Sequence, residues 1–208
     1  MTGDALALGP DGVPRCFWAV GGAREYIAYH DREWGRPVLD DDALFERLTL
    51  EAFQSGLSWL TILRKREHFR AAFAGFHIPA VAAFDDVDRE RLLADAGIVR
   101  NRLKIDAALV NARAAEDVIA EQGSLAALFW RFRPEVHRPP RSRADFVAAS
   151  PESTALAKEL KRRGFRFVGP TTAYSVMQAA GIVNDHAAGC SVAAAVATEQ
   201  DQAALRFS

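Results

Sequence analysis

The chain has 208 residues, half of them hydrophobic and a quarter charged, which is the composition of a globular protein with one or two domains. Its formal net charge is −1, although residues 61–170 hold 20 Lys and Arg against 14 Asp and Glu, so a basic face for DNA and an ordinary solvated surface are both open. Two cysteines are too few for a disulfide scaffold. No apolar run reaches the roughly 18 residues of a membrane span, and residues 1–13 lack the pattern of a secretion signal, so we expect a cytoplasmic protein.

The predicted elements are helices, because apolar residues recur at helical spacing and no stretch alternates apolar and polar residues as a strand would. The acidic residues 40–42 can cap a helix whose apolar stripe runs to Ala52, and Gly56 follows it. Further helices are predicted, in chain order, at residues 59–73, 81–94, 101–120, 153–163 (with Ser153 as its cap) and 170–181. The predicted fold class is therefore all-α.

The segments outside these helices divide the chain. Residues 132–143 are rich in arginine and proline and predict an extended basic loop between two helical lobes. Residues 1–14 form an N-terminal extension in this interpretation. Residues 196–208 have little core-forming character and are expected to be a frayed C-terminal tail. The remaining residues, 15–195, are expected to form one domain.

Residues 92–105 contain a break between two predicted helices. Gly97 allows a tight turn and Ile98 can anchor it. The free N–H groups at the start of the second helix form a phosphate site together with nearby cations, here Arg100, Arg102 and Lys104. This is the pattern of a helix-hairpin-helix module, which holds a DNA backbone without reading its sequence. An ordinary helical turn is the alternative.

Two cysteines and two histidines lie near opposite ends of the chain, at Cys16, His30, His186 and Cys190. Two thiolates and two imidazoles are a donor set of tetrahedral structural zinc sites. His186 and Cys190 are four residues apart, so on a helical turn they would point to the same side. A metal joining the two ends would close a very long loop. The spacing is not that of a standard zinc finger, so unpaired cysteines and surface histidines are the alternative.

Glu51 lies on or beside an apolar helical stripe, three residues after Leu48. A carboxylate there costs free energy unless it is paired or used in chemistry. Aromatic residues lie before and after it in the sequence, at Trp18, Tyr29, Trp34 and Trp59. Aromatic rings around one buried acid suit a pocket for a flat, electron-poor base. A plain aromatic core with Glu51 paired to an arginine is the alternative.

Together these segments resemble the 3-methyladenine DNA glycosylase I family of the helix-hairpin-helix superfamily. The matching stretches are residues 15–19, 26–35, 51–73, 95–112 and 163–190, and the most specific segments lie at 33–35, 56–59 and 184–186. The resemblance implies a compact helical enzyme that flips 3-methyladenine out of alkylated double-stranded DNA and hydrolyses its glycosidic bond. It also implies base excision repair without strand cleavage, with free 3-methyladenine as the product.

The resemblance further implies roles for particular residues. Glu51 corresponds to the carboxylate that contacts the methylated base, and we take it as the catalytic residue. The substrate-binding aromatic positions are Trp18, Tyr26, Tyr29 and Trp59. The DNA-contacting positions are Gly56 and Leu57, which enter the base stack, and Gly97, Ile98 and Arg100 in the hairpin. The ligands of a structural zinc ion are Cys16, His30, His186 and Cys190.

Three positions depart from the family pattern or leave a question. Residues 21–25 make a longer loop, which affects the place of Tyr26, and Phe53 stands where a small residue is common and could narrow the pocket. Asp117 falls near the distance after the hairpin at which related glycosylases carry a catalytic aspartate. Its neighbours Glu116 and Glu121 indicate an exposed helix face instead.

Two functions of other classes use the same features. A non-catalytic DNA-damage-binding protein would keep the hairpin and the zinc site without turnover. A zinc-dependent hydrolase would need an open coordination position, which four protein ligands would close. We expect the glycosylase to act as a monomer, because it occupies one site on DNA.

Overall fold

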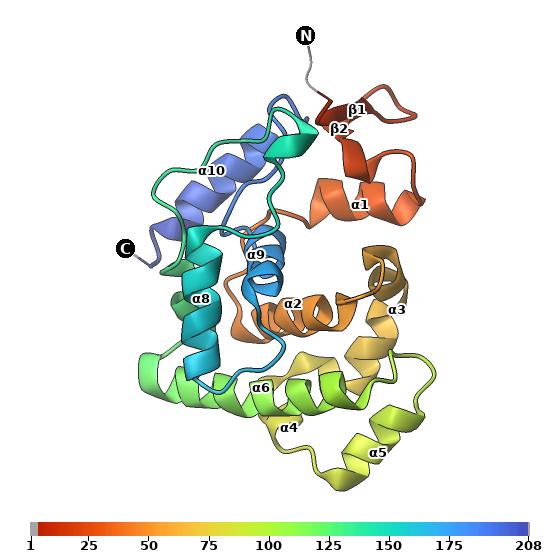
Figure 1. Ribbon diagram of the computed structural model, residues 1–208, viewed down its shortest axis with the longest axis vertical. Coiled ribbons are helices and arrows are strands. Elements are labelled where there is room, and N and C mark those ends of the chain that lie inside the picture. The colour runs from red at the N-terminus through yellow and green to blue at the C-terminus, as the bar shows by residue number, and fades with distance from the viewer. Residues whose placement is uncertain (1–3, 208) are drawn as a thin grey trace.

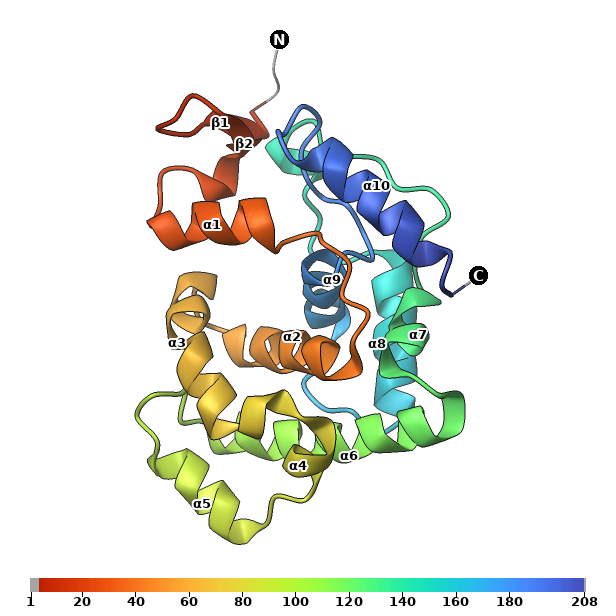
Figure 2. The ribbon, with the colours of Figure 1, turned by 180° about the vertical axis from the view of Figure 1, so that it is seen from behind.

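The computed structural model describes residues 4–207, and over that range it contains ten α-helices (Figures 1 and 2). They are α1 (Arg24–Arg32), α2 (Asp41–Gln54), α3 (Trp59–Ala72), α4 (Ile78–Ala82), α5 (Asp86–Ala94), α6 (Arg102–Gln122), α7 (Leu125–Trp130), α8 (Pro151–Arg162), α9 (Pro170–Ala179) and α10 (Ala193–Ala204). Single 3₁₀ turns lie at Phe17–Ala19, Ala74–Phe76 and Arg143–Asp145. None of the helices in the described range is long and apolar enough to cross a membrane.

Local side chains fix the starts of three helices, at or next to the boundaries that the sequence predicts. The Asp40 carboxylate accepts the Ala43 N–H at 2.9 Å, which caps α2. The Ser58 hydroxyl accepts the Thr61 N–H at the start of α3, and Asn101 accepts the Lys104 N–H at the start of α6. Each cap satisfies a backbone donor that the helix itself leaves unpaired.

Two helical boundaries differ from the prediction. The predicted helix at 81–94 is two helices, α4 and α5, because the Asp85 side chain accepts the N–H groups of Val87 and Asp88 and starts a new helix there. The predicted cap Ser153 is wrong, because Ser150 is the residue whose hydroxyl accepts an N–H group at the start of α8, that of Ser153. Both differences come from an acceptor side chain that stops one helix or begins another a few residues away.

The ends of the chain are more structured than the sequence indicates. Strand β1 (Leu6–Leu8) pairs antiparallel with β2 (Pro14–Cys16), so residues 6–16 form a hairpin that overlaps the predicted extension, of which residues 1–3 lie outside the described range. The expectation of a frayed tail after residue 195 is wrong, since α10 runs across that position with Val196 and Ala203 buried. Gln200 holds this helix to the rest of the protein by donating to the carbonyls of Gly35 at 2.7 Å and Val183 at 3.1 Å.

Helix α2 runs through the middle of the molecule and is packed by α3, α6 and α9 (Figures 1 and 2). Its buried face joins a phenylalanine cluster in which the ring centroids of Phe73 and Phe76 lie 5.6 Å apart. The N-terminal hairpin, the loop around residues 132–150 and α10 gather at one end of the molecule (Figures 1 and 2). The loop at 132–143 contains no helix up to Arg143, as predicted.

Candidate functional site

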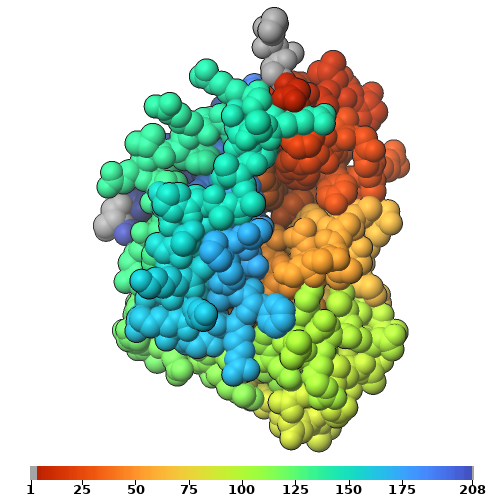
Figure 3. Space-filling view, in the orientation of Figure 1, coloured from red at the N-terminus to blue at the C-terminus, as the bar shows by residue number. Residues whose placement is uncertain are grey.

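A cavity of about 450 Å³ opens between the N-terminal segment, α2, α3 and α9, where the space-filling surface is hollowed (Figure 3). It brings together Glu51 and all of the aromatic residues that the sequence analysis placed around it. Its lining residues are Phe17, Trp18, Tyr26, Tyr29, Trp34, Glu51, Gln54, Trp59, Phe146, Ser175 and Gln178. The mixture of aromatic rings and a few convergent polar groups is typical of a small-molecule site.

Glu51 lies in the last turns of α2 and is 7% exposed. Burial raises the pKa of its carboxyl to about 8, and the nearby Arg47 guanidinium opposes that rise. Among the described residues, no hydrogen bond or ion pair is made to the Glu51 carboxyl. The alternative in which Glu51 pairs closely with an arginine is therefore wrong, and the pocket contains a carboxyl group without a partner of its own.

The aromatic residues form the walls of this cavity. The ring centroids of Tyr29 and Trp59 lie 5.3 Å apart, and Trp18 meets Trp34 edge to face at 4.8 Å. Burial and the neighbouring Glu51 raise the pKa of Tyr29, so its hydroxyl stays protonated at neutral pH. The Trp59 Nε1–H is buried without a partner in the described part of the chain. Rings in this arrangement can stack on a flat ligand.

Tyr26 reaches the pocket although the loop before it is long. Its hydroxyl accepts the Leu60 N–H at 3.1 Å, which fixes the tyrosine on the first turn of α3. Phe53 does not narrow the pocket as the sequence analysis suggested, because its side chain is fully buried against Phe69, at a centroid distance of 4.8 Å. It lies two residues after Glu51 on α2 and so points to a different side of that helix.

Sequence reasoning missed several polar lining residues. Ser175 and Gln178 come from α9 and Gln54 from the end of α2. Ser175 and Gln178 are three residues apart, a spacing that places them on one face of a helix. That spacing was the available signal, but nothing in the sequence says that this face lies opposite Glu51.

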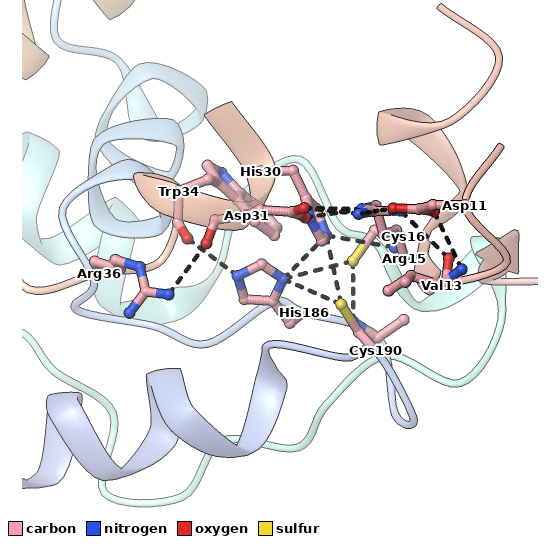
Figure 4. A network of polar contacts seen from close by, with 11 residues as sticks. Asp11, Val13, Arg15, Cys16, His30, Asp31, Trp34, Arg36, His186 and Cys190 are labelled. Carbon is pink, nitrogen blue, oxygen red and sulfur yellow. Dashed lines mark hydrogen bonds and ion pairs between the residues drawn. The ribbon is translucent and has the colours of Figure 1, made fainter. Parts of the chain in front are cut away.

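The four candidate metal ligands, two cysteines and two histidines, meet in one buried cluster beside the pocket (Figure 4). Their ligand atoms all lie within 4.8 Å of one another, and the residues are Cys16, His30, His186 and Cys190. The closest approaches are 3.2 Å between the ring nitrogens of His30 and His186, and 3.4 Å between Cys190 Sγ and His30 Nε2. The two predicted pairs from opposite ends of the chain therefore form one site that could hold a metal ion.

Both histidines of this cluster are oriented by a second contact (Figure 4). His30 Nδ1 lies 2.8 Å from the Asp31 carboxylate, which Arg15 also contacts. His186 Nε2 donates to the Trp34 carbonyl at 3.0 Å. These contacts occupy one nitrogen of each ring. The other nitrogen, which faces the cluster centre, is left free to bind a metal ion, as is typical of metal-binding histidines.

The turn after α2 carries the predicted wedge residues. Gly56 has a φ of +81°, a backbone conformation that a side chain would strain, and Leu57 is 41% exposed. Lys104 Nζ holds this turn by donating to the carbonyls of Phe53 at 2.9 Å and Ser55 at 2.6 Å. The interpretation of Lys104 as a phosphate-binding cation is therefore wrong, because its ammonium group is buried against the end of α2.

The predicted hairpin lies between α5 and α6, away from the cavity lining. Ile98 is buried and anchors the turn, and Arg100 is exposed. Gly97 is required for space, because a Cβ atom at this position would lie 3.0 Å from the His68 ring. Lys65 Nζ donates to the Gly97 carbonyl at 3.1 Å, which ties the hairpin to α3.

Two further positions from the sequence analysis lie outside this site. Asp117 is exposed on α6 and does not line the cavity. In the basic loop, Arg138 and Arg141 line a separate surface hollow with Asp145. Neither position contributes a side chain to the cavity that contains Glu51.

Comparison with known proteins assigns the chain to a family. Residues 18–194 match the methyladenine glycosylase family. The chain is 48% identical to DNA-3-methyladenine glycosylase 1 of Escherichia coli (strain K12) over 86% of its own length and 96% of the relative. It is 41% identical to a DNA-3-methyladenine glycosylase of Haemophilus influenzae, over 85% and 96% of the two chains.

Solved structures agree with this assignment. A crystal structure of 3-methyladenine DNA glycosylase I superposes with a TM-score of 0.81 at 47% identity and covers 85% of this chain and 98% of its own. A second such enzyme, solved in complex with 3-methyladenine, has a TM-score of 0.77 at 34% identity over 81% and 92% of the two chains. The cavity with its buried acid and the buried Cys–His cluster thus lie in a shared fold, and the chain belongs to the methyladenine glycosylase family.

Proposed function

We propose that this protein is a DNA-3-methyladenine glycosylase, which excises 3-methyladenine from alkylated double-stranded DNA as the first step of base excision repair. The observation that carries the proposal is the unpartnered, buried carboxyl of Glu51 inside the aromatic cavity. Family membership and relatives named for this activity agree with it. The known complex of such a relative with 3-methyladenine supports the same ligand here.

The chemistry follows from the charge of the substrate. 3-Methyladenine in DNA carries a positive charge, so its glycosidic bond is already weak and the protein's task is to flip, hold and select the base. Trp59 and Tyr29 offer ring faces, which attract a cationic base more than neutral adenine. Glu51, once ionised, opposes the positive charge and accepts a hydrogen bond from the base. Water then attacks the sugar carbon as the bond to the base breaks.

The DNA contacts in this proposal come from two turns. Leu57, exposed beside Gly56, fills the gap that the flipped base leaves in the stack. The hairpin of Gly97, Ile98 and Arg100 holds the backbone through the first turn of α6 and the Arg100 charge. No lysine is among the residues that line the described cavity, which favours a monofunctional enzyme that does not cleave the strand.

We infer that the Cys–His cluster holds a structural zinc ion. A tetrahedron with Zn–N bonds of about 2.0 Å and Zn–S bonds of about 2.3 Å has N···N edges of about 3.3 Å and N···S edges of about 3.5 Å. The corresponding separations in the cluster are 3.2 Å for N···N and 3.4, 3.6 and 3.8 Å for N···S. Four protein ligands leave no open position, so the ion would hold the two ends of the chain together, and the hydrolase alternative loses support.

We further propose a cytoplasmic monomer. One copy of the chain supplies every residue that the proposal assigns to the cavity and the hairpin, so the proposed activity requires no second copy. The relatives are bacterial, and bacterial DNA lies in the cytoplasm.

The test is base release from methylated duplex DNA, followed by chromatography of the freed bases. Native protein should release 3-methyladenine, and Glu51→Gln should release it roughly 10- to 100-fold more slowly, which is the loss expected for one hydrogen bond to a charged group. Asp117→Asn is the matched control, since it makes the same carboxylate-to-amide change on an exposed face of α6. It should keep native activity.

Failure would point to the binding-module alternative. If native, metal-loaded protein binds methylated DNA but frees no methylated base, the glycosylase proposal is wrong for this chain. If Asp117→Asn is as inactive as Glu51→Gln, the assignment of Glu51 as the group that contacts the base loses its support.

A further inference from the structure

Behind the cavity wall, two side chains of α9, Tyr174 and Gln178, join a network of polar groups that the mechanism above does not use. Its centre is Asp185, which is 3% exposed. One oxygen of this carboxylate, Oδ2, accepts from the Tyr174 hydroxyl at 2.8 Å and from Gln178 Nε2 at 2.6 Å. The other oxygen, Oδ1, lies 2.8 Å from His137 Nε2. Three groups therefore converge on one buried carboxylate.

This network fixes the orientation of the Gln178 amide. An ionised carboxylate can only accept hydrogen bonds, so the amide must present its NH₂ group to Asp185. The amide oxygen, Oε1, is then the end that is free. No hydrogen bond to Gln178 Oε1 is present among residues 4–207, and Gln178 lines the cavity. The structure therefore places a pre-oriented hydrogen-bond acceptor in the wall of the pocket.

A free acceptor in a DNA-binding cavity has few possible partners. The sugar–phosphate backbone within a DNA strand carries acceptors but no N–H or O–H donors, so an amide oxygen finds its donors on the bases. Adenine differs from guanine in its six-position, where adenine carries an amine and guanine a carbonyl oxygen. An acceptor that faces this position favours adenine and repels guanine.

We propose that Gln178 is a specificity-determining residue that accepts a hydrogen bond from the exocyclic amine of the flipped base, and that Asp185 is the residue that positions it. The proposal rests on the glycosylase function proposed above. Glu51 on α2 and Gln178 on the adjacent α9 then offer two acceptors to the two N–H groups of that amine. A 3-methylguanine would bring its carbonyl oxygen against both acceptors, and an unpaired buried acceptor is costly.

The experiment compares the release of 3-methyladenine and 3-methylguanine from the same methylated DNA. Gln178→Met keeps the length of the side chain and removes the acceptor, so 3-methyladenine release should fall about tenfold or more, while 3-methylguanine release stays level or rises. The ratio of the two rates is the readout, because a variant that merely loosens the pocket lowers both rates together.

Two variants test the positioning role. Asp185→Asn can donate to Gln178, which allows the amide to turn and present its NH₂ group to the cavity, so the ratio should fall as it does in Gln178→Met. Tyr174→Phe removes the other donor to the same carboxylate oxygen and leaves the bond to Gln178, so the ratio should stay at the native value. Metal content relative to native protein shows whether Asp185→Asn has left the neighbouring Cys–His cluster intact.

The outcomes separate this inference from the function on which it rests. If native protein releases neither base, the glycosylase proposal fails, whatever the variants do. If native protein is active and Gln178→Met lowers both releases equally, Gln178 does not read the amine and the inference is overturned. A native ratio in Asp185→Asn together with a lowered ratio in Gln178→Met would keep Gln178 and remove the role of Asp185.

Discussion

Trp34 stands between two buried polar regions, the Cys–His cluster and the aromatic cavity. Its backbone carbonyl accepts from His186 of the cluster, and its side chain lines the cavity. In the cluster, the ligand atoms all lie within 4.8 Å of one another, with contacts as short as 3.2 Å, and both histidines have a further partner. In the cavity, the Glu51 carboxyl, the Trp59 Nε1–H and the Gln178 amide oxygen have no partner within residues 4–207.

This difference is the one expected between the proposed structural metal site and the proposed base-binding pocket. Buried polar groups cost free energy unless they are paired. In the cluster, the polar atoms offset that cost by contacting one another. In the cavity, the polar groups stay unpaired and their cost is not offset. This is expected where a ligand supplies the missing partners. Damage to the cluster should therefore reduce stability, whereas damage to the cavity should reduce activity and can increase stability.

The largest effect is expected from His186→Ala. It removes one ligand of the proposed metal ion from a buried cluster, and structural metal binding contributes directly to folding free energy. We expect the melting temperature to fall by more than about 10 °C and the metal content to fall with it. His77→Ala is the control, because His77 is exposed and its ion pair with Asp42 contributes about 1 kcal/mol or less. Equal melting temperatures for the two variants would contradict a structural metal site.

Glu51→Gln should increase stability, the opposite of His186→Ala, and the size of the increase should depend on pH. The Glu51 pKa is about 8 in the folded protein and 4.5 for an unperturbed glutamate, so between these pH values the native state holds a proton that the unfolded state has lost. Native stability therefore falls as pH rises through this window and stays low above it. The amide has no proton to lose, so the variant should be more stable than native protein by about 2–4 kcal/mol at pH 9.

Urea unfolding at several pH values measures this difference. The gap between variant and native protein should shrink toward zero as pH falls toward 4.5. If the difference in unfolding free energy does not depend on pH, a partner of the Glu51 carboxylate must offset the cost of burying it.

Lys104→Met tests the contact between α6 and the turn that follows α2. Burial lowers the pKa of Lys104, yet its ammonium group satisfies the Phe53 and Ser55 carbonyls. Its removal should cost about 1–3 kcal/mol of unfolding free energy and slow base release from duplex DNA, since the turn with Leu57 would lose its anchor. Lys65→Met is the matched control, because Lys65 also donates to two carbonyls, those of Ala96 and Gly97, in a more exposed place. We expect Lys65→Met to lose less unfolding free energy than Lys104→Met. A larger loss from Lys65→Met would contradict the importance assigned to the Lys104 contact.

The smallest effect on stability is expected from Arg100→Ala. Arg100 is exposed at the hairpin, so the unfolding free energy should change by less than about 0.5 kcal/mol. Its loss should weaken DNA binding about equally for all sequences and lower the slope of log affinity against log salt by about one. Arg206→Ala, which removes an exposed arginine near the C-terminal end of the chain, should leave both unchanged. Identical salt slopes for the two variants would remove Arg100 from the DNA interface.

The sequence by itself determined the features that rest on neighbouring residues. Asp40, Ser58 and Asn101 cap their helices within three residues, and the helical spacing of Glu51 was enough to place it on a buried face. The composition of the Cys–His cluster was readable because few residue types bind zinc. Its assembly was expected only through the family resemblance.

Tertiary structure decided the features that depend on which faces meet. Lys104 turns inward because the end of α2 presents unpaired carbonyls to it, and Phe53 enters the core because α3 offers Phe69 beside it. The hydrogen bond from Gln178 to Asp185 orients a group in the cavity wall only because α9 packs where Gln178 lines the cavity. Helix caps are set by contacts within one turn of the chain, whereas these contacts join segments whose approach is fixed by the packing of the whole core.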